Sequence, residues 1–473
     1  MWRQIKRGIF NIASATILIF AAAGATWAQP GVVTHAGTLP DGATFLIEVP
    51  ANWNGTLFLY SHGYVVPGSP NPAQDFAITD PATRFFMLSS GFALAGSSYA
   101  TTGWAIQQAL PDQIAVLDIF SQTVGTPKRT IAWGHSLGGM ITAGLIQLYP
   151  DRFDAALPMC GVLSGGIATW NTALDSAFAF KTLLGAPGLQ VANITDPVGN
   201  LKLAEGLLAA AAGTAQGRAR LSLVAALGDT PGWFTPLSPE PSPADFADQQ
   251  INQFLWASMV DFPFAFAFRA ELEFRAQGNP SWNTGVDYRR QFEHSADAAE
   301  VRALYAQAGL DLDADLKMLN ETERIGADPQ AANYLKENIT YNGEIHIPVL
   351  TLHTTGDGLV VVENESAYRD IVGEEGNERF LRRRFISRAG HCAFTPAETI
   401  AAMKALLNRL DTGQWGPLDV TDLNNEAEAL GSSFNIFANS AGMIVPVAPA
   451  FVEFHPSQYL RPFDAEDKDH DKD

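Results

Sequence analysis

A serine lies between two glycines at residues 134–138, in the stretch Gly-His-Ser-Leu-Gly. The stretch follows a short apolar run at 130–133 and precedes a helical pattern over 137–149. Gly-x-Ser-x-Gly between a strand and a helix is typical of a sharp turn that exposes a serine hydroxyl above a sheet. An ordinary glycine-rich turn is the alternative, but the flanking strand and helix favour Ser136 as a nucleophile.

A serine hydroxyl is a weak nucleophile, so it needs a base and a group that orients the base. Asp357 lies in HTTGDGLVV, just after a predicted strand at 347–353, and His391 lies in ISRAGHCAFTP, after a predicted strand at 379–387. The order serine, acid, histidine is the one found on parallel sheets of this kind. We therefore predict His391 as the base and Asp357 as its orienting acid.

Other carboxylates and histidines compete for these roles. Glu363 and Glu365 are near the acid position, but they fall at the start of the next predicted helix, where carboxylates commonly act as caps. His353 lies inside a strand and is expected to be a core or supporting residue. His294 and His346 are expected to be surface or structural residues.

Two backbone donors would have to stabilise the oxyanion that forms when serine attacks a carbonyl carbon. The N–H of Leu137, directly after the serine, should be one donor. The second should come from the loop after the strand 55–63, and we assign it to the N–H of Tyr64. Gly63 would keep this turn open, and His62 would brace the loop.

The elements that must position these residues alternate between strands and helices. Predicted strands cover 42–50, 55–63, 92–99, 130–133 and 155–160, with helices at 80–90, 106–124 and 137–149. The first two strands are expected to be neighbours joined by the Asn52–Gly55 turn. The alternation indicates an α/β fold with a parallel sheet and helices on both faces.

The strand–helix alternation stops at about residue 165 and returns at 347. The segment between shows mostly helical patterns, at 170–184, 200–212, 216–227, 244–276 and 297–319. After it come the strands 347–353 and 379–387, with helices near 364–372 and at 396–410. One α/β domain with a large helical insertion is the simplest organisation.

Together, the elbow, the His-Gly loop and the later Asp357 and His391 resemble those of secreted serine hydrolases of the α/β-hydrolase superfamily, in its esterase/lipase-like branch. The resemblance covers residues 40–165 and 345–412. It implies a mostly parallel sheet of about eight strands with a helical cap inserted after the sixth. It also implies ester hydrolysis through an acyl-enzyme. A peptidase, a lactonase and a non-catalytic binding protein on the same fold are the alternatives.

Substrate contacts are harder to assign than the reacting groups. Trp104, after the strand 92–99, is a candidate wall of the cleft. We expect His135 to pack under the elbow and count it with Trp104 among the substrate-binding residues. The insertion is rich in phenylalanine and tryptophan, most of it ordinary core. The substrate is expected to be a small-molecule or polymeric ester.

The charge of the chain argues against two classes of binding partner. The net charge of the 473-residue chain is −20, and such a surface repels nucleic acid and anionic lipid. The sequence has no zinc-ligand spacing and no phosphate-binding glycine loop, so we expect no metal and no organic cofactor. The oligomeric state stays open.

The N-terminus has the pattern of a secretory signal peptide. Basic residues precede an apolar stretch from about Ile9 to Ala25, and Thr26-Trp27-Ala28 offers a cleavage site. The expected divisions are a signal peptide at 1–28, hydrolase core at 29–164 and 344–412, a helical cap at 165–343, and a C-terminal extension at 413–473 with an acidic disordered end. We expect a secreted or periplasmic protein without a membrane span after cleavage; an uncleaved anchor is the alternative.

The chain has two cysteines, Cys160 and Cys392. Cys160 ends the strand after the elbow, and Cys392 directly follows His391, whose loop must reach back toward Ser136. Their Cβ atoms could then approach to about 4 Å, as a disulfide requires. We predict a disulfide beside the predicted catalytic residues, and two separate buried thiols are the alternative.

Overall fold

The computed structural model describes residues 31–71, 80–416, 418–438 and 442–463. The predicted signal peptide at 1–28 and the acidic end of the chain lie outside these ranges. In the ranges that are described, no helix combines the length and the apolar character needed to cross a membrane.

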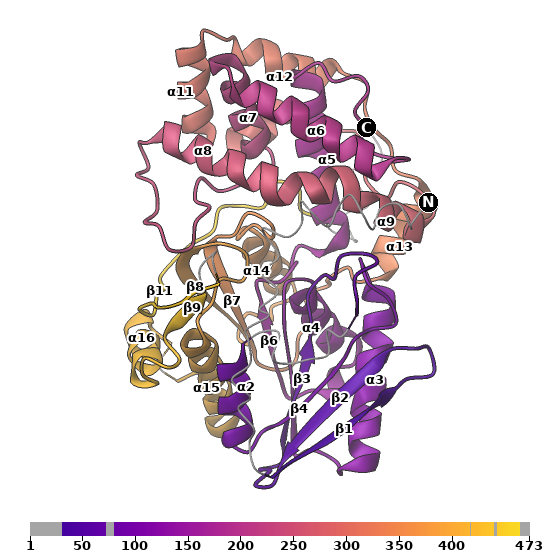
Figure 1. Cartoon of the computed structure of the whole chain (residues 1–473), viewed down its shortest axis with the longest axis vertical. Helices are drawn as coiled ribbons and strands as arrows, with labels where there is room; N and C mark the ends of the chain where they lie inside the picture. Colours follow the sequence, from indigo (N-terminus) through magenta and orange to yellow (C-terminus); the bar gives the residue numbers. More distant parts are fainter. Residues whose placement is uncertain (1–30, 72–79, 417, 439–441, 464–473) are drawn as a thin grey trace.

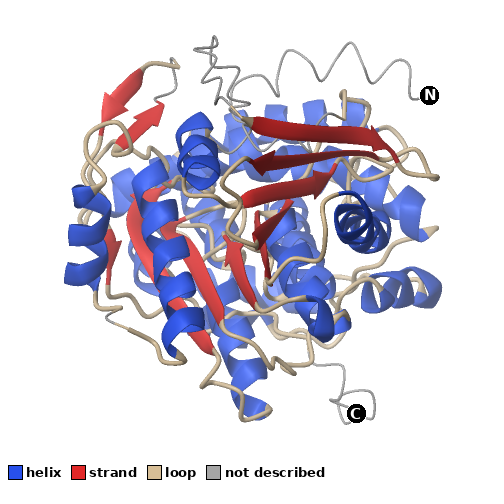
Figure 2. Cartoon of the chain, turned by 90° about the horizontal axis from the view of Figure 1, so that it is seen from below, coloured by secondary structure: helices blue, strands red, loops and turns tan. Residues whose placement is uncertain are grey.

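A nine-stranded sheet, seen from below in Figure 2, forms the centre of the α/β part, in the order β1-β2-β4-β3-β5-β6-β7-β8-β11. Strands β3 to β8 run parallel, while β1, β2 and β11 are antiparallel to their neighbours. The strand bounds are β1 (Val32–Thr38), β2 (Thr44–Pro50), β3 (Thr56–Ser61), β4 (Ala93–Ser97), β5 (Arg129–His135), β6 (Ala155–Met159), β7 (Val349–Gly356), β8 (Leu381–Ala389) and β11 (Phe451–Val452).

Side chains alternate between the two faces of the sheet, as they must along an extended strand. In β3, Leu57 and Leu59 join one apolar cluster while Phe58 and Tyr60 join another. The first cluster includes residues of α3 (Ile106–Thr123), α4 (Leu137–Leu148) and α14 (Asn364–Glu374). The second includes residues of α2 (Pro81–Ser89) and α15 (Pro396–Thr412). The sheet is therefore buried on both faces, which parallel strands require.

Between β6 and β7 the chain leaves the sheet and forms a helical insertion, which lies above the sheet in Figure 1. The insertion has an apolar core of its own, built from buried residues of its helices. Its elements are α5 (Gly165–Leu183), α6 (Pro197–Ala212), α7 (Ala215–Ala226), α8 (Phe246–Trp256), the π-helices η5 (Ala257–Asp261) and η6 (Phe264–Phe268), α9 (Arg269–Ala276), α10 (Tyr288–His294), α11 (Ala298–Ala308), α12 (Leu312–Glu321) and α13 (Pro329–Glu337).

The C-terminal extension packs on the rest of the chain rather than trailing away from it. It contains α16 (Val420–Ala429), the small sheet of β9 (Ile436–Ala438) and β10 (Ile444–Pro446), and β11, which pairs with the edge of β8. Beyond β11, Tyr459 and Arg461 reach the insertion: Tyr459 accepts a hydrogen bond from Thr172, and Arg461 pairs with the buried Asp175. The extension thus ties the two parts of the molecule together.

Three expectations about the elements need correction. Strands β2 and β3 are not neighbours, because β4 lies between them. The residues around Gly55 therefore connect two strands that do not pair. The helix expected at 297–319 is two helices, since Gly309 adopts a left-handed conformation, with φ of 66°, that ends α11. The helix expected at 244–276 contains the two π-helical turns η5 and η6.

Candidate active site

The predicted nucleophile lies on the turn from β5 into α4, at the carboxyl edge of the sheet, where the parallel strands β3 to β8 end. Ser136 has φ of 60° and ψ of −126°, a conformation that costs a non-glycine residue roughly 1–3 kcal/mol. Its backbone N–H donates to the carbonyl oxygen of Met159, 3.0 Å away. A Cβ atom on Gly134 or Gly138 would collide with the carbonyl oxygen of Ser61. The glycines therefore let the end of β3 pack directly against the elbow.

The predicted base and acid are in contact. His391 Nδ1 lies 2.7 Å from Asp357 Oδ2. The other oxygen, Asp357 Oδ1, accepts the backbone N–H groups of Leu359 and Val360, each at 3.0 Å. Burial would raise the pKa of Asp357, but the charge of His391 and hydrogen bonds from His391 and His353 lower the pKa below its usual value. Asp357 is thus a fixed carboxylate that can orient the imidazole and stabilise its positive charge.

The serine and histidine are brought to the same edge without a hydrogen bond between them. Among the residues that the structure describes, Ser136 Oγ has no hydrogen-bond partner, and His391 Nε2 lies 3.4 Å from Cys392 Sγ. Burial, and to a smaller degree the charge of His391, lower the pKa of His135, the residue before the serine, to about 3. Proton transfer would need His391 Nε2 to approach Ser136 Oγ, and such bonds often tighten only in the reacting complex.

A disulfide holds the histidine loop at this edge. Cys160 and Cys392 are joined, with Cα atoms 5.4 Å apart. Cys160 follows Met159, whose carbonyl oxygen accepts the Ser136 N–H, and Cys392 follows His391. The bridge thus connects the residue after the histidine to the strand beside the elbow. Both sulfurs are used in it, so the nearby group Cys160, His391 and Cys392 offers no thiolate to a metal ion.

The competing carboxylates have other partners. Glu363 accepts a hydrogen bond from Ser457 of the C-terminal extension, at 2.8 Å. Glu365 accepts one from Thr351 at 2.6 Å and contacts His353 Nδ1 at 3.2 Å. His353 also has the carbonyl oxygen of Val360 at 2.8 Å from Nε2. His353 therefore supports the loop that carries Asp357, and neither glutamate contacts His391.

The predicted oxyanion loop lies against the serine. A Cβ on Gly63 would come within 3.2 Å of Ser136 Cβ, so glycine allows the close approach. His62 is buried, stacks on Tyr99 with ring centroids 3.9 Å apart, and has its two ring nitrogens 2.7 Å from the carbonyl oxygen of Gly63 and 3.1 Å from that of Ser98. Burial lowers the pKa of His62 to about 4 despite these two contacts, so the ring is neutral at physiological pH and donates a hydrogen bond to one of the two carbonyl oxygens. It braces the loop.

A cavity of about 150 Å³ opens beside the serine, between the carboxyl edge and the insertion. A dry cavity of this size holds a single benzene ring in other proteins. Ser136, Leu137 and Tyr64 line it together, so the two assigned N–H donors belong to the residues around the cavity mouth. Rings from the insertion form much of the wall: Trp170, Phe254, Phe262, Phe264 and Phe266.

Of the two predicted substrate-binding residues, one lines this cavity and one does not. Trp104 lines it, and its ring meets that of Trp170 edge-on with centroids 5.5 Å apart. His135 is absent from the lining residues and packs instead against the rings of Tyr60, Trp133 and Phe394. These contacts agree with the expected packing of His135 under the elbow, and its substrate role stays a prediction. The side chain of His135 points to the opposite side of the chain from that of Ser136 and packs under the elbow.

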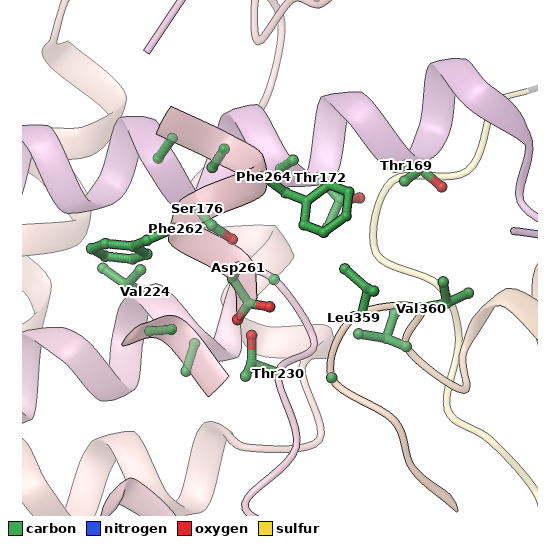
Figure 3. Close-up of a pocket in the computed structure, with 18 of the residues that line it drawn as sticks. Thr169, Thr172, Ser176, Val224, Thr230, Asp261, Phe262, Phe264, Leu359 and Val360 are labelled. Atoms are coloured by element: carbon green, nitrogen blue, oxygen red, sulfur yellow. The ribbon is translucent and has the colours of Figure 1, made fainter. Parts of the chain in front are cut away.

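Sequence reasoning named few residues of the cavity wall, and two that it missed are informative. Tyr459 comes from the C-terminal extension, which no pattern connected to the site. Asp261 ends η5 and points into the cavity in Figure 3. One signal could have found Asp261: it is the single charged residue in the otherwise apolar stretch FLWASMVDFPFAFAF, residues 254–268.

Comparisons with known proteins found matches in both sequence and structure. The pattern of the prolyl oligopeptidase family matches residues 95–177, which include the elbow. An o-phthalyl amidase from Xanthobacter agilis is 31% identical over 429 residues, which cover 83% of this chain and 90% of the relative.

The solved structures that the comparison matched to this chain include two esterases. One, from Aspergillus oryzae, is 15% identical with a TM-score of 0.42. The match covers 81% of this chain and 79% of the esterase chain. The rice cell wall degrading esterase LipA from Xanthomonas oryzae has 14% identity and a TM-score of 0.36, with coverage of 80% and 87%. Likeness at this level says nothing about substrate.

Proposed function

The chain belongs to the same protein family as o-phthalyl amidase, within the α/β-hydrolase superfamily of serine hydrolases, and we propose that it cleaves carboxylic esters through an acyl-enzyme. The superfamily predicted from the motifs is thus confirmed. The observation that carries the proposal is the 2.7 Å contact between His391 and Asp357 at the edge where Ser136 occupies a strained elbow beside a cavity.

In the first half of the proposed reaction, His391 Nε2 removes the Ser136 proton while Oγ attacks the carbonyl carbon of the ester. Asp357 holds the Nδ1–H of His391 and stabilises the imidazolium that forms. The N–H groups of Leu137 and Tyr64 would bind the oxyanion, helped by the N-terminal dipole of α4. The imidazolium then protonates the leaving alcohol, and the acyl group stays on Ser136.

In the second half, a water molecule takes the place of the alcohol. His391 accepts a proton from the water as its oxygen attacks the acyl carbon, and then returns the proton to Ser136 Oγ. The acid leaves and the free enzyme is restored. This chemistry uses side chains and backbone groups of the chain alone.

Amide hydrolysis is the second candidate, and the named relative favours it. An amide differs mainly in its leaving amine, which must be protonated by the imidazolium as it departs. An o-phthalyl amide is a benzoyl amide with a second carboxyl group on the ring. The ring matches a cavity of about 150 Å³, whereas the carboxylate would find no lysine, arginine or histidine among the described lining residues.

The proposal is tested first at the serine. A fluorophosphonate probe should label the purified protein, and Ser136→Ala should abolish both labelling and hydrolysis while the melting temperature stays the same. Loss of a triad residue lowers turnover by several orders of magnitude. Turnover in the alanine variant close to that of the wild type would refute the proposal. Matched aryl esters and anilides of benzoic acid would then rank ester against amide cleavage.

We further propose that the protein is exported and loses residues 1–28. The disulfide between Cys160 and Cys392 supports this, because such bridges persist in oxidising compartments. N-terminal sequencing of the exported form should find a start close to Ala28. A membrane-bound protein that still begins at Met1 would indicate an anchor instead.

A further inference from the structure

Asp261 is the one carboxyl group among the residues that line the cavity. It ends the π-helix η5, and π-helical turns are frequent at functional sites. In the described part of the chain it makes no hydrogen bond and no ion pair. Figure 3 shows its carboxyl group inside the cavity, directed toward the Thr230 hydroxyl, with Phe262 on one side and Leu359 and Val360 on the other.

A second polar group on the same wall also lacks a partner. Gln253, two turns before Asp261, is 2% exposed, and its Oε1 accepts no hydrogen bond from a described residue. Its Nε2 is already used, donating to Glu300 Oε2 at 2.9 Å and to the carbonyl oxygen of Thr230 at 3.4 Å. Buried polar atoms normally have partners. Of the two side chains, Asp261 is the one whose carboxyl group Figure 3 shows inside the cavity, so it is the acceptor that a ligand in the cavity would meet.

The surroundings of Asp261 disfavour its ionised form. Burial, and then the charge of Asp357, raise the pKa of Asp261 to about 8. The carboxyl group is thus held mostly neutral near pH 7 when nothing positive is nearby. A cation beside it would favour the carboxylate and gain a charge-assisted hydrogen bond.

We propose that the cavity binds an organic ammonium group and that Asp261 determines this preference. The inference rests on the proposed acyl-transfer function: the substrate group that enters the cavity carries a protonated amine. Aromatic faces such as those of Phe262, Phe264 and Trp170 attract cations, and an ammonium offers hydrogen-bond donors to the Asp261 carboxyl group.

Other ligand charges fit the cavity less well. An anionic group would meet the Asp261 carboxyl with no basic side chain in the described lining to pair with it. A neutral group of the same shape would fill the cavity but would leave the carboxyl group without a positive partner. The expected order of affinity is cation, then neutral group, then anion.

The test is direct binding, which does not depend on turnover. Benzylammonium, benzyl alcohol and benzoate have similar size and differ in charge, and calorimetry at pH 8 would measure their dissociation constants. In the wild type we expect benzylammonium to bind at least about tenfold more tightly than benzyl alcohol, as one hydrogen bond to a charged group allows. Benzoate should bind most weakly.

Asp261→Asn keeps the shape of the side chain and removes its charge, so the preference for benzylammonium over benzyl alcohol should fall to about twofold or less. The matched control is Asp248→Asn, which removes an exposed carboxylate from the same stretch of helix outside the cavity and should keep the wild-type ratio.

Two results would overturn the proposal. One is wild-type protein that binds benzoate or benzyl alcohol as tightly as benzylammonium, a result that needs no variant to fold. The other is a cation preference that survives Asp261→Asn. Binding in the expected order by a protein that hydrolyses neither esters nor amides would refute the proposed function and leave the ammonium site standing.

Discussion

The carboxyl edge of the sheet and the cavity wall of the insertion differ in whether their polar groups have hydrogen-bond partners. At the edge, Asp357 accepts hydrogen bonds from His391 and from two backbone N–H groups and has His353 beside it, and the histidine loop is anchored by a disulfide. On the cavity wall, Asp261 and Gln253 Oε1 have no partner among the described residues. A fixed arrangement suits groups that must hold one geometry through a reaction. Polar groups without a partner in the protein suit a binding surface, because a ligand can supply the missing hydrogen bond.

The largest expected effect is at the acid of the edge. Asp357→Asn should lower kcat by about 10⁴, because a neutral amide neither stabilises the imidazolium nor holds the required tautomer. Glu363→Gln is the matched control, since Glu363 bonds Ser457 and not His391. Steady-state kinetics with an aryl ester would measure both variants. A dead Glu363→Gln variant beside an active Asp357→Asn variant would move the acid to Glu363.

The next effect concerns the disulfide. Replacing both Cys160 and Cys392 by alanine removes a bridge between residues 232 positions apart and should lower the free energy of unfolding by about 2–5 kcal/mol. Because Cys392 follows His391, activity should fall at a reductant concentration below the one that unfolds the protein. Activity and tryptophan fluorescence, followed along one reductant series, would measure this. Coincident loss of both signals would show that the bridge supports the whole fold rather than the histidine loop.

The sequence predicts the carboxyl edge better than it predicts the cavity wall. The elbow, the acid and the histidine each follow a strand, so periodicity and glycine positions place them on the parallel sheet. The order of β2, β4 and β3 depends on pairing between distant strands, and the turn residues alone suggested a hairpin instead. Strand β1 was not predicted, because its side chains are mostly half-buried or exposed and its pattern is polar.

The cavity wall is less predictable because it depends on how helices pack. Asp261 faces the cavity through a π-helical turn, which changes the direction of side chains relative to an α-helix of the same sequence. Tyr459 reaches the wall from a segment more than one hundred residues beyond the insertion. The position of Tyr459 has no local sequence signal. The lone charge of Asp261 in an apolar stretch marks the residue but does not indicate which way its side chain points, whereas the Gly-x-Ser-x-Gly turn is local by nature.

A smaller effect tests the support under the acid. Burial lowers the pKa of His353, but hydrogen bonds and the charges of Asp357 and Glu365 outweigh it and raise the pKa to about 10. The folded pKa lies above the unfolded value of about 6.5. The stabilisation is therefore fully present below pH 6.5 and is lost as pH rises toward 10.

Urea unfolding of the wild type and His353→Gln between pH 6.5 and 10 would measure this loss. The wild-type free energy of unfolding should fall more steeply than that of the variant. Parallel curves would mean that His353 is neutral in the folded protein and that Asp357 is held without it.

The smallest effect should appear on the cavity wall, where a change of shape alters which substrate is used and leaves the reacting groups in place. Val224 lines the cavity beside Asp261 and Phe262 (Figure 3). Val224→Phe would fill part of about 150 Å³, and overfilling of this kind costs about 1–3 kcal/mol. The ratio of kcat/KM for a benzoate ester to that for an acetate ester should therefore fall about tenfold. An equal loss of kcat/KM for both esters would mean that Val224 supports the reacting groups at the carboxyl edge. The proposed difference between the edge and the cavity wall would then be wrong at this position.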